Sequence, residues 1–279
     1  GHQVVGLSRD KNRASKILPW AESVHEWVPI RGEPDTSAFA KVDAVVNLAG
    51  ESVQGLWTTA KRQEILNSRV IGTSNLIAAM ERQDDPPKVF VNASAAGWYG
   101  DRGEDLLRED VAPGKTFLAQ VSQKWEEASK VVEGDGIRIV NLRTGFVLGS
   151  GGGFLSPLVR IYKFALGSRL GSGRQWWSWI HQEDYARLVL FLLERNVNGP
   201  VNACSPFPVR QSEFNKTLGK VLRRPTILYT PSIVLKVLLG GLSEDLLVSR
   251  RVSAEKCEEM GFTFQFPELE PALRDLLAL

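Results

Sequence analysis

The stretch Val42-Asp43-Ala44-Val45-Val46-Asn47-Leu48-Ala49-Gly50-Glu51 is apolar along most of its length and ends in small residues. Such a run is typical of a strand that is buried on both faces of a parallel sheet. Small residues after the strand let the backbone approach a bound molecule closely. A tight turn from strand to helix needs the same residues, so this stretch alone leaves both interpretations open.

Similar runs, rich in Val and Ile, alternate with amphipathic segments through the first half of the chain. The further candidate strands are Val4–Ser8, Trp27–Ile30, Val89–Ser94 and Ile137–Leu142. Between them, Lys61–Gln83 and Phe117–Val132 place apolar residues at helical spacing. This alternation predicts an α/β fold, a doubly wound and mostly parallel sheet with helices on both faces.

The second half of the chain predicts shorter and more mixed elements. Its candidate elements are a loop at Gly149–Gly153, strands at Trp176–Ile180, Val201–Ala203 and Phe262–Phe266, and a helix at Gln182–Glu194. We expect a nucleotide-binding domain over residues 1–150, which also receives a strand and a helix from about 175–205. A smaller mixed α/β substrate-side domain would span 151–279, with a mostly helical last unit over about 224–279.

Composition excludes several classes of protein. Hydrophobic residues make up 43% of the 279 residues and charged residues 24%, which is ordinary for a globular protein and excludes disordered, collagen-like and coiled-coil chains. No apolar run is long enough to cross a bilayer, and the first residues lack a signal-peptide pattern. The formal charge of +2 does not predict a nucleic-acid binder, and three scattered histidines do not predict a metal site.

Two cysteines, Cys204 and Cys257, suit a reducing compartment better than a disulfide framework. We therefore expect a cytoplasmic protein, or an organellar one, for example in the plastid stroma, if the source is eukaryotic. A small-molecule substrate is the expected partner, with no membrane partner, and a homodimer stays open.

Small or polar residues follow four of the predicted strands. These tips are Ser8-Arg9, Asn47–Gly50, Ser94–Gly100 and Arg143–Gly149. Ligands of open α/β sheets bind beyond the carboxyl ends of the strands.

An arginine suits a ribose 2′-phosphate because its planar guanidinium can hold two phosphate oxygens, although an arginine after a strand is more often simply solvated. Ser94 can donate to a substrate carbonyl, and Tyr99 can transfer a proton if a cation lowers its pKa. Packing over the sheet edge is the alternative for the aromatic residues of the third tip.

These motifs resemble the extended or atypical short-chain dehydrogenase/reductases of the epimerase type. Val70–Leu76 resembles the family's helix that faces the active site, Asn47–Gly50 its adenine loop, and Arg143–Gly149 its nicotinamide loop. Further segments are similar to one subgroup with a dedicated C-terminal domain: Asn47–Glu51, Ser94–Gly100, Trp125-Glu126, Leu148–Gly153, Leu170–Gly173, Leu222–Pro225 and Gly261–Leu277.

The resemblance implies a Rossmann-like fold that binds NADP(H). The residues it places at the cofactor are Ser8, Arg9, Leu48, Ala49, Gly50, Thr144 and Phe146, and the catalytic candidates are Ser94 and Tyr99. It implies an atypical NADP-dependent oxidoreductase or epimerase-like enzyme that acts on an unknown small molecule. The alternative is a non-catalytic NADP(H)-binding scaffold or sensor with a link to cell or plastid division.

Two departures from the family leave the choice between enzyme and scaffold open. The family's first strand, Gly-rich turn and first helix should precede Gly1, so we expect this chain to be a fragment. The family's Tyr-x-x-x-Lys pair is also missing, because Phe117 and Leu118 cannot exchange a proton and Lys124 has no Tyr four residues before it. Arg69 stands where the family usually has an Asn.

Overall fold

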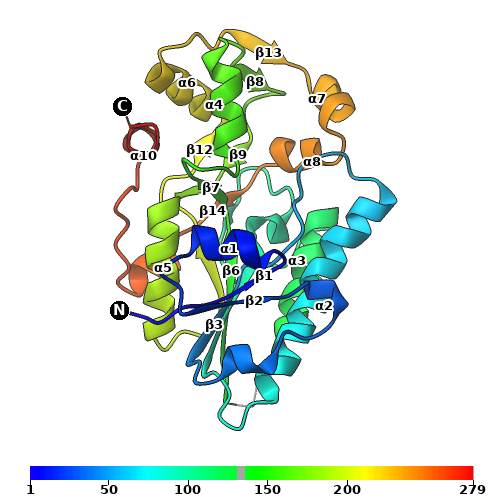
Figure 1. Cartoon of the computed structure of the whole chain (residues 1–279). Coiled ribbons are helices and arrows are strands. Elements are labelled where there is room, and N and C mark those ends of the chain that lie inside the picture. The colour runs from blue at the N-terminus through cyan, green and yellow to red at the C-terminus, as the bar shows by residue number, and fades with distance from the viewer. Residues whose placement is uncertain (131–135, 279) are drawn as a thin grey trace.

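The computed structural model describes residues 1–130 and 136–278, and a four-stranded sheet lies at its centre (Figure 1). The strand order is β11-β6-β4-β3, with bounds β3 (Ala44–Asn47), β4 (Val89–Ala95), β6 (Arg138–Thr144) and β11 (Gly199–Ala203). All neighbours in this sheet are parallel. Their carboxyl ends therefore meet at one edge, where the four predicted tips were expected to converge.

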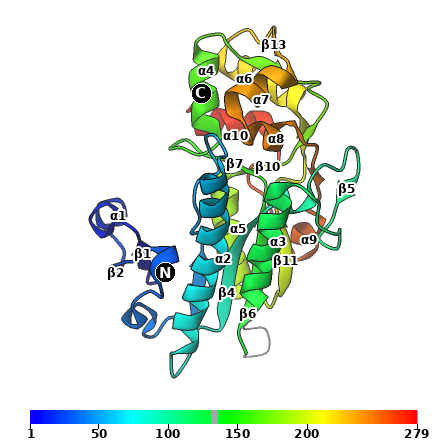
Figure 2. The ribbon, with the colours of Figure 1, turned by 90° about the vertical axis from the view of Figure 1, so that its right-hand side faces the viewer.

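Helices cover both faces of this sheet. They are α2 (Thr59–Glu81), α3 (Phe117–Ser129) and α5 (Gln182–Glu194). Successive residues of a strand point to opposite faces, so Phe90 of β4 packs with Met80 of α2, while Val91 packs with Leu188 of α5. Figure 2 shows α2 and α3 side by side on one face of the sheet. The predicted doubly wound α/β fold is confirmed.

The first two strands form a separate parallel pair. β1 (Val5–Ser8) and β2 (Ser23–Glu26) flank α1 (Lys11–Ile17), and Figure 2 shows this unit set apart from the main sheet. Within residues 1–130 and 136–278, no strand ladder joins β1 to β3. In the described residues, β1 and β3 thus each pair with a neighbouring strand on one side only.

The strand predicted at Trp27–Ile30 is wrong, because β2 ends before it and Pro29–Arg31 forms a 3₁₀ turn (η1). The side chain of Trp27 is buried, and its Nε1 donates to the carbonyl of Gly32 at 2.9 Å. Pro29 has no N–H to offer to a strand ladder. The apolar run therefore marks a buried corner rather than a strand.

The strand predicted at Phe262–Phe266 is also wrong. Phe262 and Phe264 are buried against each other, with ring centres 4.9 Å apart. The N–H groups of Gln265 and Phe266 donate to the carboxylate of Asp184 at 2.7 and 2.8 Å. A carboxylate from α5 takes the place of a neighbouring strand, so an extended aromatic segment forms without a ladder.

Two other predicted elements have different bounds. The aromatic run Trp176–Ile180 splits at Ser178 into β9 (Trp176–Trp177) and β10 (Trp179–His181), which pair with different strands. The helix predicted to continue to Val132 is described only as far as residue 130, so its last two residues lie outside the described part of the chain.

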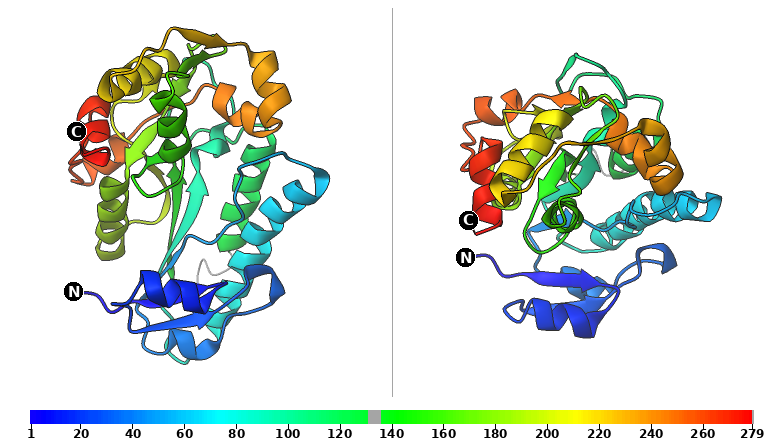
Figure 3. Two further views of the ribbon diagram at one scale, coloured as in Figure 1. Left: turned by 45° about the horizontal axis from the view of Figure 1, so that its top comes forward. Right: turned by 90° about the horizontal axis from the view of Figure 1, so that it is seen from above.

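The remaining elements form a smaller part over the carboxyl ends of the sheet (Figures 1 and 3). They are β7 (Phe146–Leu148), α4 (Leu155–Lys163), β8 (Ser168–Leu170), β12 (Val209–Arg210), α6 (Gln211–Leu222), β13 (Leu228–Thr230), α7 (Ser232–Leu239), α8 (Leu242–Leu247) and α10 (Leu269–Leu276). Trp177, Phe214 and Leu273 lie in its buried core.

Short elements link this smaller part to the sheet. They are the 3₁₀ turn η3 (Ala96–Tyr99), the parallel pair β5 (Leu106–Leu107) and β14 (Arg251–Val252), and α9 (Glu255–Glu259). A further 3₁₀ turn, η2 (Thr36–Phe39), packs against α2 instead. Because β14 and α9 return to the sheet side, the two parts are interwoven. Among the described helices, none combines the length and the apolar character that a bilayer crossing requires.

Candidate cofactor and substrate site

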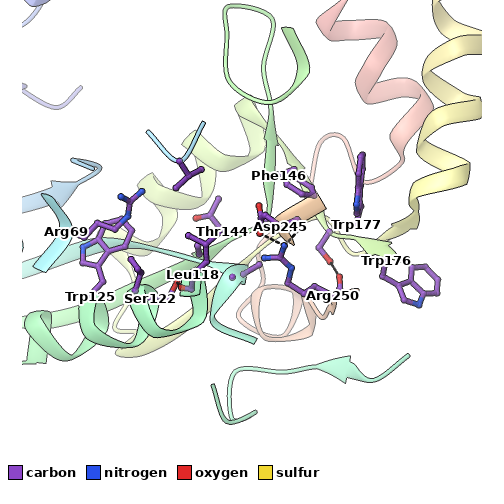
Figure 4. Close-up of a pocket in the computed structure, with 17 residues that line it drawn as sticks. Arg69, Leu118, Ser122, Trp125, Thr144, Phe146, Trp176, Trp177, Asp245 and Arg250 are labelled. Carbon is purple, nitrogen blue, oxygen red and sulfur yellow. Dashed lines mark hydrogen bonds and ion pairs between the residues drawn. The ribbon is translucent and has the colours of Figure 1, made fainter. Parts of the chain in front are cut away.

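A cavity of about 190 Å³ lies where the carboxyl ends of the sheet meet the smaller part (Figure 4). Its aromatic lining consists of Trp125, Phe146, Trp176 and Trp177. Of the described residues that line it, the titratable ones are Arg69, Asp245 and Arg250. An aromatic cavity with a few charged groups is the usual form of a small-molecule site.

The bend between β6 and β7 forms one wall. A Cβ on Gly145 would lie 2.6 Å from the carbonyl oxygen of Ser178, so only glycine fits this crossing. The N–H of Phe146 donates to the same carbonyl at 2.9 Å. Thr144 and Phe146, two predicted cofactor residues, both line the cavity as a result.

The tips of β1 and β3 come together, as the sequence predicts for a nucleotide site. Nη1 of Arg9 lies 3.4 Å from Oε2 of Glu51, the residue that follows Gly50. The guanidinium of Arg9 remains largely free, because 69% of its side chain is exposed. The Oγ of Ser8 is exposed and donates to the carbonyl of Asp10 at 3.2 Å.

Glu51 is held between two cations. Its Oε1 accepts a hydrogen bond of 2.5 Å from Nζ of Lys61, and Arg9 lies on its other side. The hydrogen bond from Lys61, together with the charges of Lys61 and Arg9, keeps the pKa of Glu51 below its ordinary value. Nζ of Lys61 also lies 4.0 Å from Oε2 of Glu64, so Arg9, with its exposed side chain, is the cation here that can meet an incoming anion.

Leu48, Ala49 and Gly50 form the loop after β3. Leu48 and Gly50 are exposed and Ala49 is half-buried, and the N–H of Ala49 donates to Oδ1 of Asn47 at 3.1 Å. Asn47 in turn donates to Asn92 at 2.9 Å, which anchors the loop to the neighbouring strand. The sequence identified the loop, whereas this amide pair follows only from the strand register.

Ser94 and Tyr99 belong to a buried network beside the cavity. The Oγ of Ser94 donates to Glu126 at 2.7 Å, and Glu126 binds Arg143 through both carboxylate oxygens at 2.9 and 3.0 Å. The hydroxyl of Tyr99 donates to Asn202 at 2.6 Å and accepts from Arg143 at 3.2 Å.

Burial raises the pKa of Tyr99 far above its ordinary value, although the charge of Arg143 opposes the shift. Neither Ser94 nor Tyr99 lines the cavity. The geometry gives both hydroxyl groups a structural role, and their proton-transfer role stays a prediction.

Helix α3 presents Leu118 and Ser122 to the cavity, four residues apart on one face. Lys124 lies on the exposed side of the helix. Along the described length of α3, no titratable side chain therefore reaches the cavity. This is the structural consequence of the missing Tyr-x-x-x-Lys pair.

Arg69, on α2, lies at the end of the cavity nearest the β3 loop. Its Nη1 donates to the carbonyls of Glu51 and Ile65 at 2.9 and 3.1 Å, and its Cζ lies 5.0 Å from the ring centre of Trp125. Burial lowers its pKa to about 10, so the guanidinium stays charged at neutral pH. The sequence shows Arg69 only as a departure from the family pattern.

Asp245, on α8, and Arg250, between α8 and β14, face the cavity from the C-terminal segment. Nη2 of Arg250 donates to the carbonyl of Asp245 at 2.7 Å and also to its Oδ1. The two side chains are 15% and 10% exposed. Sequence reasoning missed both, because neither lies at a strand end or in a recognisable motif.

Comparison with known proteins gives two family matches. Residues 1–204 match the NAD dependent epimerase/dehydratase family, and residues 230–276 match a domain of unknown function, DUF1731. The chain is 39% identical to the epimerase family protein ML0860 of Mycobacterium leprae over 256 residues, 91% of this chain and 82% of that protein. It is 35% identical to the epimerase family protein YfhF of Bacillus subtilis, over 100% of this chain and 91% of that protein.

Among solved structures, the chain is similar to that of the human epimerase family protein SDR39U1 (isoform 2), determined with NADPH. The TM-score is 0.85 at 28% identity, and the match covers 98% of this chain and 99% of that chain. A structure of RMD from Pseudomonas aeruginosa, complexed with NADPH, shares the fold with a TM-score of 0.70 at 17% identity.

Proposed function

Because the chain belongs to the NAD-dependent epimerase/dehydratase family, we propose that it binds NADP(H) and acts as an oxidoreductase on a small molecule in the cavity. The meeting of the β1 and β3 tips, with Arg9 and Glu51 3.4 Å apart, carries this proposal. A relative of the same fold whose structure contains NADPH supports it.

The charges at these tips favour the phosphorylated cofactor. Lys61 is paired with Glu51 and lies 4.0 Å from Glu64, whereas the exposed guanidinium of Arg9 can bind the anionic ribose 2′-phosphate with two N–H groups. In this proposal Ser8 and Arg9 hold the 2′-phosphate. Leu48, Ala49 and Gly50 lie along the adenosine, where the small residues Ala49 and Gly50 admit a flat ring and the exposed Leu48 offers it apolar surface.

Thr144 and Phe146 would border the nicotinamide, since both line the cavity. The nicotinamide supplies the hydride chemistry when it is bound. Phe146 stacks on Phe154 with ring centres 4.1 Å apart, which fixes its position on the wall. The surrounding tryptophans exclude water, and in a water-poor cavity the charges of Arg69 and Arg250 act more strongly on a bound molecule.

The proposal is tested by titrating the protein with NADPH and NADH, using the fluorescence of the reduced nicotinamide. We expect Arg9→Gln to weaken NADPH binding about tenfold, because it removes the binding free energy of about one hydrogen bond between charged groups. NADH lacks the 2′-phosphate, so its binding should stay unchanged. Arg13→Gln, at an exposed position of α1, is the matched control and should bind both cofactors normally. Equal losses for both cofactors, or no loss in Arg9→Gln, would contradict the proposal.

The second candidate function is a non-catalytic NADP(H)-binding scaffold or sensor. It is favoured by α3, which brings Leu118 and Ser122 rather than a proton-transfer group to the cavity. The two candidates differ in one measurement. An enzyme should change the absorbance of bound NADPH when small aldehydes and ketones are added, whereas a scaffold should bind NADPH without turnover.

A further inference from the structure

We propose that Arg250 recognises a compact oxyanion, a carboxylate or a phosphate, on the substrate, so that the cavity takes a small anionic molecule with an apolar body. The proposal rests on the proposed function, because the cavity is the same site. It adds the chemical class of the substrate and the residue that selects it.

The hydrogen-bonding state of Arg250 is the first observation. Both contacts to Asp245 use Nη2. Among the described residues, Nε and Nη1 make no hydrogen bond, although the side chain as a whole is only 10% exposed. A guanidinium carries five N–H donors, so the donors on Nε and Nη1 remain available to an acceptor that enters the cavity.

The position of Arg250 directs these donors toward the cavity. Figure 4 shows Arg250 reaching toward Asp245 in the middle of the lining residues. Gly97 leaves space on the η3 side, since a Cβ at that position would lie 3.6 Å from Nη1. Leu118 and Trp177 supply apolar surface nearby, so an oxyanion would meet two free donors at the edge of an apolar cavity.

Arg250 is distinct from the cation on the cofactor side. Arg69 lies against Gly50 and Glu51, in the segment proposed to hold the cofactor, and Figure 4 shows it apart from Asp245 and Arg250. The N–H of Arg250 donates to the carbonyl of Trp176 at 3.0 Å, which fixes it to the smaller part of the molecule. The two arginines thus line separate parts of one cavity.

Asp245 makes the proposal sharply testable, because it acts on Arg250 in two ways. It holds the guanidinium in place through Nη2, but its own negative charge repels an incoming anion and offsets the positive charge of Arg250. If Arg250 serves anion binding, removing the charge of Asp245 should strengthen that binding. If the ion pair is only structural, losing either partner should weaken binding alike.

The experiment measures binding of three probes by isothermal titration calorimetry, with the whole chain saturated with NADPH. Benzoate and phenyl phosphate are the anionic probes, and benzamide is the uncharged probe with the same phenyl ring. We expect both anions to bind at least about tenfold more tightly than benzamide. Arg250→Met should abolish this preference, Arg250→Lys should keep part of it, and Asp245→Asn should increase it. Arg160→Met, at an exposed position of α4, is the control and should behave like the unmodified protein.

Four results would overturn the proposal: no preference for anions, a preference that survives Arg250→Met, equal losses in Arg250→Met and Asp245→Asn, or loss of NADPH affinity in Arg250→Met. The last would assign Arg250 to the cofactor instead. If Arg250→Met fails to fold, the opposite effects of Arg250→Lys and Asp245→Asn decide the question. If the protein binds no NADPH, the proposed function fails, while the anion preference is still measured without cofactor.

Discussion

Arg143 and Glu126 form an ion pair that is almost completely buried, with side chains 3% and 4% exposed. The pair is bidentate and also holds Ser94, so each charge is fully compensated. We expect Glu126→Ala to lower the free energy of unfolding by about 3–5 kcal/mol, because it leaves the Arg143 charge buried and uncompensated. Urea denaturation measures this loss.

The control for this prediction is an exposed pair elsewhere in the chain. Arg274 and Glu270 lie one helical turn apart on α10, at 2.8 Å, in contact with water. Because water screens such a pair, Arg274→Ala should change the urea midpoint far less than Glu126→Ala. Similar midpoints for the two variants would show that the buried pair contributes no more than a surface pair.

Tyr99→Phe separates a structural role of this hydroxyl from a catalytic one. The change removes a donor to Asn202 and an acceptor for Arg143, so we expect a loss of about 1–3 kcal/mol in unfolding free energy. Because Tyr99 is buried outside the cavity, we expect turnover of any substrate found to stay within a few-fold of the unmodified protein. A general acid contributes roughly 100-fold or more, so a loss of that size would restore the role predicted from the sequence.

Some residues of the site can be predicted from the sequence, and others cannot. The tip Arg143–Gly149 is visible in the sequence, and the family resemblance points to Thr144 and Phe146 within it; both lie on the cavity wall. Whether a tip side chain points into the cavity or into the core is decided by distant partners. Tyr99 turns to Asn202, 103 residues away, and no local pattern predicts that contact.

At the scale of elements, the crossing of β6–β7 over Ser178 is the tightest point of the site. Gly145→Ala would place a Cβ 2.6 Å from a backbone oxygen, so the bend must shift and carry Phe146 with it. We expect a loss of about 1–3 kcal/mol in unfolding free energy, as for other overpacked positions, and weaker NADPH binding. Thermal unfolding and NADPH fluorescence measure the two effects.

Gly151→Ala is the matched control for this change, because a Cβ there meets no atom within 4 Å. It should leave both the melting temperature and NADPH binding unchanged. If Gly145→Ala behaves in the same way, the close approach at Ser178 does not position the wall.

Long elements with a clear period were predicted well, and short ones were not. Residues of β4 and β6 are buried on both faces of the sheet and read as continuous apolar runs, and α5 has the bounds its pattern predicts. Short strands such as β13 and β14 have too few residues to show a period, and their partners lie far away in the chain. Trp27 and Phe262 were read as strand residues because burial in a corner and burial in a strand select the same side chains.

At the scale of the whole molecule, a buried imidazole lies at the junction between the sheet and the C-terminal segment. Nδ1 of His181 accepts from the N–H of Glu183 at 3.1 Å and so caps α5. The ring stacks on Phe266 with centres 4.0 Å apart, and its Nε2 lies 3.2 Å from Asp275 of α10. His181 is therefore buried between α5 and the last helix of the chain.

Burial lowers the pKa of His181, although the carboxylates of Asp275, Asp184 and Glu183 oppose the shift. A lowered pKa means that the unfolded chain takes up a proton at a higher pH than the folded protein does. The stabilisation is thus complete above the ordinary histidine value of about 6.5 and is lost as the pH falls from there toward the folded pKa.

We therefore expect the melting temperature to fall as the pH drops from about 7.5 to about 5.5, a range in which ordinary carboxylates stay ionised. His181→Gln removes the titrating ring, so this variant should be less stable at the upper pH and should lose much less stability on acidification. His2→Gln is the matched control, because His2 is exposed near the N-terminus, and it should keep the slope of the unmodified protein. If the melting temperature of His181→Gln falls with decreasing pH as steeply as that of the unmodified protein, another group is responsible for the acid sensitivity. A slope that disappears there alone would show that protonation of one ring loosens the closure of the C-terminal segment over the sheet.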